Sequence, residues 1–532
     1  MFKQDRGRKL ATLAVTCIGL FMVLLDMTIV NVALPTIQSD LGAGLSGLQW
    51  VVDAYTLPFA ALLLTAGTLG DRYGRKRVFL VGLVGFTLGS AMCGFAPSLG
   101  WLIAGRILQG AGGAALSPGS LSLLAAAFPD NRERTQAIGI WAGVSGLALA
   151  AGPLVGGSLI QVSSWPAIFF VNLPIGLIAF LFGWRILAES RNPDARRVDL
   201  PGQILAISGL AALTYALIEG ESDGWTSPLI LSLFASAAVF LIAFLIVEAR
   251  VREPLLPLQL FKSLVFSTAN IASVLLGFAL VGTVFFMSQY FQSVQGYSAL
   301  GSGLRTLPAT VGTFVAAPLA GQLAARLSPR LPITLGGLLA GSGLLFFTRL
   351  NPTSGYSDIW WELAMFGIGL GLMISPLTAA VLSATPTNRT GLGSSMVNTS
   401  RQIGSVFGIA LLGALVEQQF TNNLLSNLIN LHLPEALSQK IASAISSAGA
   451  EAGNVHLSGR LPITPAMLHL AIGQSFTDSL HLSFLFAGSA LLCVALLGAF
   501  LLRTRRRAVA DQAASEEVRE EIIAAAVEME AL

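Results

Sequence analysis

Charged side chains are scarce in this chain. Asp, Glu, Lys and Arg make up 11% of its 532 residues, whereas 54% of the residues are hydrophobic. An ordinary soluble domain has roughly 25% charged residues, so the composition excludes a soluble globular protein and predicts a protein embedded in lipid. The net charge is only +3, which offers no basic face for a nucleic acid, and no nucleic-acid partner is expected.

Cysteine and the motifs of enzymes are equally rare. Cys17, Cys93 and Cys493 lie inside apolar runs without CxxC spacing, so we interpret them as packing residues and not as a disulfide or metal site. The histidines of the segment 420–476 have no ligand spacing either. The sequence contains no phosphate-binding loop and no G-x-S-x-G motif. It therefore predicts no catalytic residue, no metal site, no cofactor and no ATP-driven pump.

Apolar runs, in contrast, are abundant, and many are long enough to cross a bilayer, which takes about 20 residues for a helix. The first run includes Asp26 and is not followed by a small-residue cleavage pattern, so it is interpreted as a retained membrane helix. About fourteen membrane helices are predicted. They lie at residues 10–34, 48–70, 78–96, 100–127, 136–160, 166–187, 200–219, 228–247, 266–291, 302–325, 331–348, 359–385, 395–419 and 477–502.

The basic residues are distributed unequally between the two sets of loops. One set holds Lys and Arg at 3–9, 72–77, 132–134, 185–197, 250–262, 326–330, 389 and 503–507, and the other set holds only Arg349, Lys440 and Arg460. Lys and Arg near helix ends are retained on the cytoplasmic side. Because an even helix count puts both ends of a chain on one side, both termini are predicted to be cytoplasmic.

Two segments do not fit the pattern of membrane spans. The segment 420–476 lies on the outer side and contains short amphipathic patterns such as Leu424, Leu425 and Leu428, which predict a partly helical or hairpin cap over the outer mouth. From about residue 508 the chain is acidic and alanine-rich. This composition predicts a solvated helix or a disordered tail.

A short repeat indicates two homologous halves. The sequence GTLGDRYGRK at 67–76 is similar to GQLAARLSPR at 321–330, with Ala325 in the place of Asp71. Parallel repeats of this kind are common in secondary transporters. The predicted organisation is an N-terminal six-helix bundle (1–187), an inserted helix pair with linkers (188–262), a C-terminal six-helix bundle that includes the outer loop 420–476 (263–502), and a cytoplasmic tail (503–532).

Four local patterns resemble those of the fourteen-helix drug:proton antiporter branch of the major facilitator superfamily. They are LDMTIVNVALP at 25–35, the segment 67–76, RILQG at 106–110 and GPLVGG at 152–157. The last departs at one place, where Ala148 stands instead of the usual Gly. With the helix count, the patterns cover most of the chain. The resemblance implies an all-α membrane protein of the major facilitator fold, with two six-helix bundles plus two inserted helices, that exports multiple drugs or quaternary ammonium compounds.

Asp26 and Arg106 are predicted to lie deep in membrane helices. A charge at the centre of such a helix costs about 2.5–3.5 kcal/mol on insertion scales. Asp26 is either a protonatable group that lines the central cavity or a structural carboxylate that caps a helix break near Asn31 and Pro35. Arg106, which stays charged, is predicted to contact Asp26 or carbonyls of the first helix. The resemblance implies a proton-coupling role for Arg106, and a static bridge between two helices is the alternative.

A second set of residues is predicted nearer the outer face. Trp50, Asp53 and Tyr55 resemble a pattern of exporters of cationic dyes, which implies a part in recognising cations or protons. The alternatives are an exposed helix-start carboxylate and aromatic residues of the membrane interface. Glu417 resembles an acidic position of some cation exporters, or is an exposed helix-end carboxylate. The acidic residues at 219–223 predict a solvated loop or a mouth that steers cations.

The two remaining motifs are expected to serve movement. In the segment 67–76, glycines allow tight helix ends and charged residues hold the halves closed, so a cytoplasmic gate is predicted at Gly67, Asp71, Arg72, Gly74, Arg75 and Lys76. The antiporter motif combines a small-residue face with a proline bend. It predicts a seam at which the halves rock, or a simple tight contact, at Gly152, Pro153, Gly156 and Gly157.

The expected function is proton-coupled efflux of amphipathic, mainly cationic compounds by alternating access, with the proton gradient as the energy source. The expected partners are an amphipathic small molecule, protons and the lipid of a bacterial inner membrane. The alternative is export of a native metabolite or lipid by the same fold. A receptor or scaffold would not need Asp26 and Arg106 at lipid depth.

Overall fold

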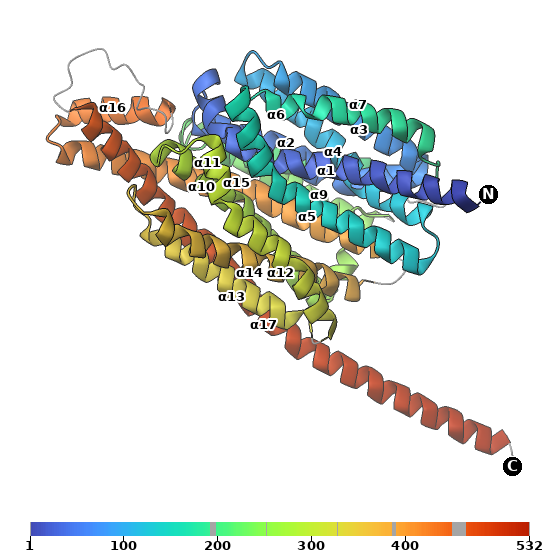
Figure 1. Cartoon of the computed structure of the whole chain (residues 1–532). Helices are drawn as coiled ribbons and strands as arrows, with labels where there is room; N and C mark the ends of the chain where they lie inside the picture. The colour runs from blue at the N-terminus through green and yellow to red at the C-terminus, as the bar shows by residue number, and fades with distance from the viewer. Residues whose placement is uncertain are drawn as a thin grey trace.

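The chain is built from long helices. The computed structural model describes residues 2–191, 198–251, 253–326, 328–385, 390–448 and 464–530. Within these ranges the regular structure is helical and contains no strand, which confirms the predicted all-α fold class. Figure 1 shows that α1 (Phe2–Leu41) begins and α17 (Pro465–Glu530) leaves at one end of the molecule, whereas α16 (Glu435–Ala448) lies at the opposite end.

The first group of helices starts with α1 and packs around α4. Its other members are α2 (Leu45–Tyr73), α3 (Arg75–Gly94), α4 (Leu99–Ala127), α5 (Asn131–Val162), α6 (Ala167–Phe170) and α7 (Asn172–Ile186). Helix α2 ends directly before Gly74, whose φ of 117° lies in a region that side chains with a Cβ rarely adopt. This glycine lets the chain turn at once into α3.

The second group repeats the packing of the first. It contains α10 (Leu264–Gln289), η2 (Tyr290–Val294), α11 (Ala299–Arg305), α12 (Leu307–Arg326), α13 (Arg330–Phe346), η3 (Phe347–Arg349), α14 (Tyr356–Ser383), α15 (Thr390–Asn430), α16 and α17. The contacts α2–α4, α3–α4, α1–α5 and α3–α7 of the first group recur as α12–α14, α13–α14, α10–α15 and α13–α17. The short sequence repeat at 67–76 and 321–330 therefore occupies equivalent helix ends, those of α2 and α12.

Between the two groups lie α8 (Leu200–Ile218) and α9 (Pro228–Arg250), which pack against each other. Each begins with a side-chain cap, in which Asp199 accepts a hydrogen bond from Gly202 N and Ser227 accepts one from Ile230 N. Helix α8 also contacts α2 and α15. In α9 only 11% of the most apolar stretch is buried, so its surface is left for lipid. After α9, a short helix, η1 (Leu258–Lys262), leads into α10.

The number of helices that meet a length and hydropathy criterion for crossing a membrane is close to the predicted number of spans. In the described ranges twelve helices are long and apolar enough to cross a membrane, and a bent pair within α5 makes up to thirteen. The count of fourteen is therefore not confirmed, although each predicted span coincides with a helix. The predicted run 302–325 is divided between α11 and α12, so Arg305 lies at the helix boundary with its guanidinium 3.4 Å from the ring centre of Tyr297.

The helix ends near the C-terminus also differ from the prediction. Helix α15 continues to Asn430 instead of ending at 419, because the amphipathic pattern at Leu424 and Leu428 buries both side chains in the helix interface. The predicted helical element of the outer loop exists as α16, which buries Ile441 and Ile445. Residues 449–463 of that loop lie outside the described residues. Helix α17 starts twelve residues earlier than predicted, at Pro465, and runs through the acidic tail to Glu530.

Candidate site at the centre of the first helix group

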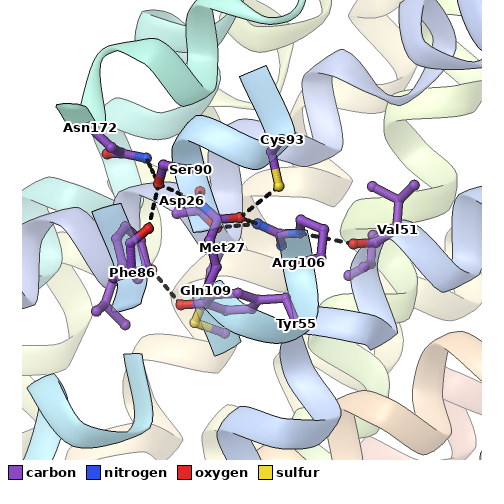
Figure 2. A network of polar contacts seen from close by, with 12 residues as sticks. Asp26, Met27, Val51, Tyr55, Phe86, Ser90, Cys93, Arg106, Gln109 and Asn172 are labelled. Atoms are coloured by element: carbon purple, nitrogen blue, oxygen red, sulfur yellow. Dashed lines mark hydrogen bonds and ion pairs between the residues drawn. The ribbon is translucent and has the colours of Figure 1, made fainter. Parts of the chain in front are cut away.

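Asp26 and Arg106 form an ion pair inside the first group of helices. The Arg106 Nη1 atom donates to Asp26 Oδ2, and the two residues are 1% and 0% exposed. Arg106 Nε also donates to the carbonyl oxygen of Val51 at 3.0 Å. The predicted contact with Asp26 is therefore present, whereas the bonded carbonyl belongs to α2 and not to the first helix. Figure 2 shows the pair with its surrounding polar side chains.

Gln109 completes the binding of the aspartate. Its Nε2 atom donates to Asp26 Oδ1 at 3.0 Å and to Ser90 Oγ at 2.7 Å, while its Oε1 atom accepts from Arg106 Nη1 at 2.9 Å. Cys93 Sγ lies 3.4 Å from the same Oε1 atom. Gln109 was not predicted as a site residue, although its place three residues after Arg106 puts both side chains on one face of α4. Both charged groups are thus bonded to protein groups.

Close helix packing positions this network. A methyl group on Gly110 would collide with the backbone of Tyr55 in α2, and one on Gly89 would lie 2.7 Å from Gln109 N in α4. The small residues therefore let α2, α3 and α4 approach closely. Tyr55 is fully buried, donates to Val23 O at 3.1 Å, and has its ring centre 4.3 Å from the Arg106 guanidinium carbon. Tyr55 belongs to the ion-pair site and not to a surface aromatic belt.

The interpretation of Asp26 as a cap at a helix break is wrong. Helix α1 runs without interruption from Phe2 through Pro35 to Leu41, and Asn31 Nδ2 donates to Met27 O within the same helix. The carboxylate instead joins α1 to α4. The remaining alternatives, a proton-coupling pair and a static bridge, both fit this geometry.

Asp53 is buried without a bonded partner. Its side chain is 0% exposed, and neither carboxylate oxygen has a hydrogen-bond partner in the described part of the chain. The interpretation as an exposed helix-start carboxylate is therefore wrong. One turn earlier on the same face of α2, Gln49 is also fully buried with an unpartnered amide. Gln49 was not predicted as a site residue, because in the sequence it is only an amide within an apolar run.

Trp50 lies near the N-terminal end of α2 and contacts the inserted pair. Its Nε1 atom donates to Glu219 Oε1 at 2.7 Å, and its ring centre is 5.7 Å from that of Tyr215 in α8.

Glu417 of α15 is 8% exposed, and its Oε2 atom has no bonded partner. The interpretation of Glu417 as an exposed helix-end carboxylate is wrong, because α15 continues for three more turns. The predicted recognition set is thus divided, with Tyr55 beside Arg106 and Trp50 beside Glu219 of the acidic loop after α8.

The charged segment after α2 is bound within its own half of the molecule. Arg75 Nη2 forms an ion pair with Asp71 Oδ1 at 2.8 Å, and Lys76 Nζ donates to Trp184 O at 2.6 Å. A methyl group on Gly74 would lie 2.6 Å from the carboxyl group of Glu189, which accepts from Lys76 N at 3.1 Å. Arg72 lies over the neighbouring Tyr73 ring, and Gly67 faces Pro118 of α4. In this conformation these contacts do not bridge the halves.

The glycines of the antiporter motif pack against two different helices. Methyl groups on Gly152 and Gly156 would collide with Thr28 and Ile29 of α1, two and three residues after Asp26. A methyl group on Gly157 would lie 2.5 Å from Leu300 Cα of α11, in the other half. Helix α5 bends by 43° after Leu149, the residue whose carbonyl the Pro153 ring blocks. The motif therefore joins a contact within the first half to a contact between the halves.

Replacing Gly152 by Ala is expected to destabilise the protein by about 1–3 kcal/mol, because the added methyl group overlaps Thr28 in a packed contact. Thermal unfolding of the purified protein in detergent measures the loss. Gly143→Ala in the same helix is the matched control, since no atom lies within 4 Å of its Cβ position, and it is expected to leave stability unchanged or slightly raised. Equal effects of both substitutions would contradict the packing role.

The halves contact each other through α1 and α10. Ser288 Oγ of α10 donates to Asn31 O at 2.7 Å, and Gln292 Nε2 donates to Val32 O at 3.1 Å. A second contact between the halves is formed where Gln49 of α2 packs directly against Gly413 of α15. The fold and its two packed halves are those of an α-helical membrane transporter.

Comparison with known proteins agrees with this class. Residues 16–409 match the Major Facilitator Superfamily. The chain is 36% identical to the tetracenomycin C resistance and export protein of Streptomyces glaucescens over 96% of this chain and 94% of the relative. It is 40% identical to the multidrug resistance protein Stp of Mycobacterium tuberculosis over 77% of this chain and 76% of the relative.

A solved structure supports the fold. A bacterial homologue of the human lysosomal transporter Spinster, in an inward-facing and unoccupied conformation, matches with a TM-score of 0.66 at 16% identity over 93% of this chain and 98% of that chain. The chain belongs to the major facilitator superfamily and is a multi-pass membrane transporter. The family and fold expected from the sequence motifs are confirmed.

Proposed function

We propose that this transporter exports amphipathic, mainly cationic compounds in exchange for protons, in the inner membrane of a bacterium and with both termini in the cytoplasm. Its relatives are named for resistance to, or export of, tetracenomycin C, methylenomycin A and multiple drugs. The positions of basic loop residues support the orientation. The location of both chain ends at one end of the helix bundles agrees with it (Figure 1).

The observation that carries this proposal is the unpartnered, fully buried carboxyl group of Asp53. An ionised carboxylate without a partner is very costly at this depth. The group is therefore stable in two forms, protonated or paired with a bound cation. Exchange between these forms at one carboxyl group is the elementary step of proton–cation antiport.

The Asp26–Arg106 pair couples this exchange to the change of shape. Arg106 binds the α2 backbone at Val51, which lies two residues before Asp53, and it binds α1 through Asp26. Protonation of Asp26 removes half of the ion pair and frees the guanidinium to move with α4. Thr28 and Ile29, just beyond Asp26, pack against the α5 glycines, so movement of α1 reaches the contact between the halves.

A direct test is efflux of ethidium, a fluorescent lipophilic cation, in everted membrane vesicles energised by respiration. Accumulation of ethidium in the vesicle lumen, together with release of luminal protons on addition of ethidium, is expected. Both signals should disappear when a protonophore collapses the gradient. Uphill accumulation that continues without the gradient would contradict proton coupling.

The segment 67–76 is proposed to close the cytoplasmic side. Asp71→Asn removes the ion pair with Arg75 and is expected to lower the ethidium transport rate about tenfold, on the order of 1.4 kcal/mol in the barrier, without changing which compounds compete. Glu133→Gln, which removes the exposed Lys9–Glu133 pair on the same side, is the control and should be near neutral. Normal transport by well-expressed Asp71→Asn protein would contradict the gate.

A further inference from the structure

The contact between α2, α8 and α15 contains a row of buried polar groups with no bonded partner. The atoms are Asp53 Oδ1 and Oδ2, Gln49 Oε1 and Nε2, and Glu417 Oε2. Nearly all buried polar side chains in proteins are bonded to protein or to ordered water. Five such atoms in one helix contact therefore indicate a hydrated structure, since water needs two to four polar partners and this row offers them.

The groups follow one another from the outer face inward. Gln49 precedes Asp53 by one turn, on one face of α2. The Gln49 amide packs directly against Gly413 of α15, where the absence of a side chain leaves room for it. Glu417 lies one turn beyond Gly413, toward the outer end of α15. The order is thus Glu417, Gln49, Asp53.

The inserted helix pair supplies the outer end of this row. Glu219 accepts from Trp50 Nε1 at 2.7 Å and from Ser222 Oγ at 2.8 Å, and Glu221 accepts from Trp225 Nε1 at 3.0 Å. Glu219 is the C-cap residue of α8, and α8 contacts α15, the helix that carries Glu417. Several negative charges at one mouth raise the local concentration of cations, including protons.

We propose that this row carries protons from the outer side to Asp53, and that the inserted pair α8–α9 forms its mouth through Glu219 and Glu221. A proton from outer water forms an O–H bond on the Glu417 carboxylate. It then passes through water held by the Gln49 amide to the Asp53 carboxylate, and Glu417 regains its negative charge. Gln49 and Glu417 are buried in this conformation, so the part of the row that leads to Asp53 fits a path for protons and water and not a path for the drug-sized cation. The proposal rests on the proposed function.

Everted vesicles test this path because their lumen corresponds to the outer side. The variants are the double substitution Glu219→Gln with Glu221→Gln, which keeps oxygen acceptors for Trp50 and Trp225, and Gln49→Leu, which removes the relay amide. Each is expected to slow ethidium-induced release of luminal protons at least fivefold. Exchange of labelled for unlabelled ethidium, measured with the gradient collapsed, should stay at the wild-type rate and shows that the variants are folded. Glu435→Gln, an exposed acid at the start of α16, is the matched control.

The outcomes separate the two proposals. If the wild-type protein releases no protons on ethidium addition, the proposed function fails and the path fails with it. If the wild-type protein is active and the variants release protons at the wild-type rate, only the path is overturned. A loss of ethidium exchange equal to the loss of proton release would also overturn it, because that result assigns these residues to substrate binding or to folding.

Discussion

Asp26→Leu is expected to destabilise the transporter by about 3–5 kcal/mol, because it leaves a buried guanidinium without its counter-charge. Arg106 is 1% exposed and cannot lose its proton to escape the penalty. Arg106→Met should cost less, since the remaining Asp26 carboxyl group can accept a proton and keeps its hydrogen bond from Gln109. Thermal unfolding of the purified proteins in detergent measures this asymmetry between the two single substitutions.

The double variant Asp26→Leu with Arg106→Met distinguishes a static bridge from a coupling pair. Apolar replacement of both partners of a buried ion pair is often neutral or stabilising, so the double variant should regain most of the lost thermal stability. A folded double variant without ethidium-induced proton release is the expected result. Wild-type proton release by the double variant would show that the pair only joins α1 to α4, and the coupling role would have to be abandoned.

The sequence allowed the helices and the main ion pair to be predicted for clear physical reasons. An apolar run of membrane length is expected to form a helix, because every backbone amide in lipid must be hydrogen-bonded inside the segment. Charges as isolated as Asp26 and Arg106 in such runs need partners, which made their contact predictable. The helix that continues from 419 to Asn430 was not predictable in this way. Its stability comes from tertiary burial of Leu424 and Leu428 on one face, which hydropathy alone does not measure.

The grouping of residues within the site was harder to predict. Three residues of the predicted set, Trp50, Asp53 and Tyr55, lie within six residues of one another but have different neighbours. Trp50 contacts α8, Asp53 lies in the row with Gln49, and Tyr55 lies against Arg106. On a helix these positions face different directions, and the neighbours in each direction come from α4, α8 and α15. The Gln109 amide makes as many hydrogen bonds as Arg106 does. The Gln49 amide has two unpartnered polar atoms, as the Asp53 carboxyl group has. Neutral amides carry no charge that would mark them in a sequence, so their roles appear only when the helices are packed.

Asp53→Asn is expected to abolish ethidium efflux, with a loss of at least a hundredfold, while leaving the protein folded. Neither carboxylate oxygen of Asp53 has a bonded partner, so the isosteric amide breaks no hydrogen bond and should change thermal stability by less than about 1 kcal/mol. The amide cannot take up a proton or neutralise a cation. Efflux in everted vesicles measures the loss, and Asp53→Glu, which keeps the carboxyl group, should retain part of the activity.

Export of uncharged substrates distinguishes two possible roles of Asp53, which are binding of the cation alone and binding of both the cation and the proton. If Asp53 only binds the cation, Asp53→Asn should still export uncharged amphipathic compounds with the proton gradient. If Asp53 also carries the proton, export of charged and uncharged compounds should be lost together, and this is the result that the buried, unpaired carboxyl group favours. A partly active Asp53→Asn protein would mean that another carboxyl group accepts the proton. Wild-type export of ethidium by Asp53→Asn would contradict exchange of proton and cation at this residue.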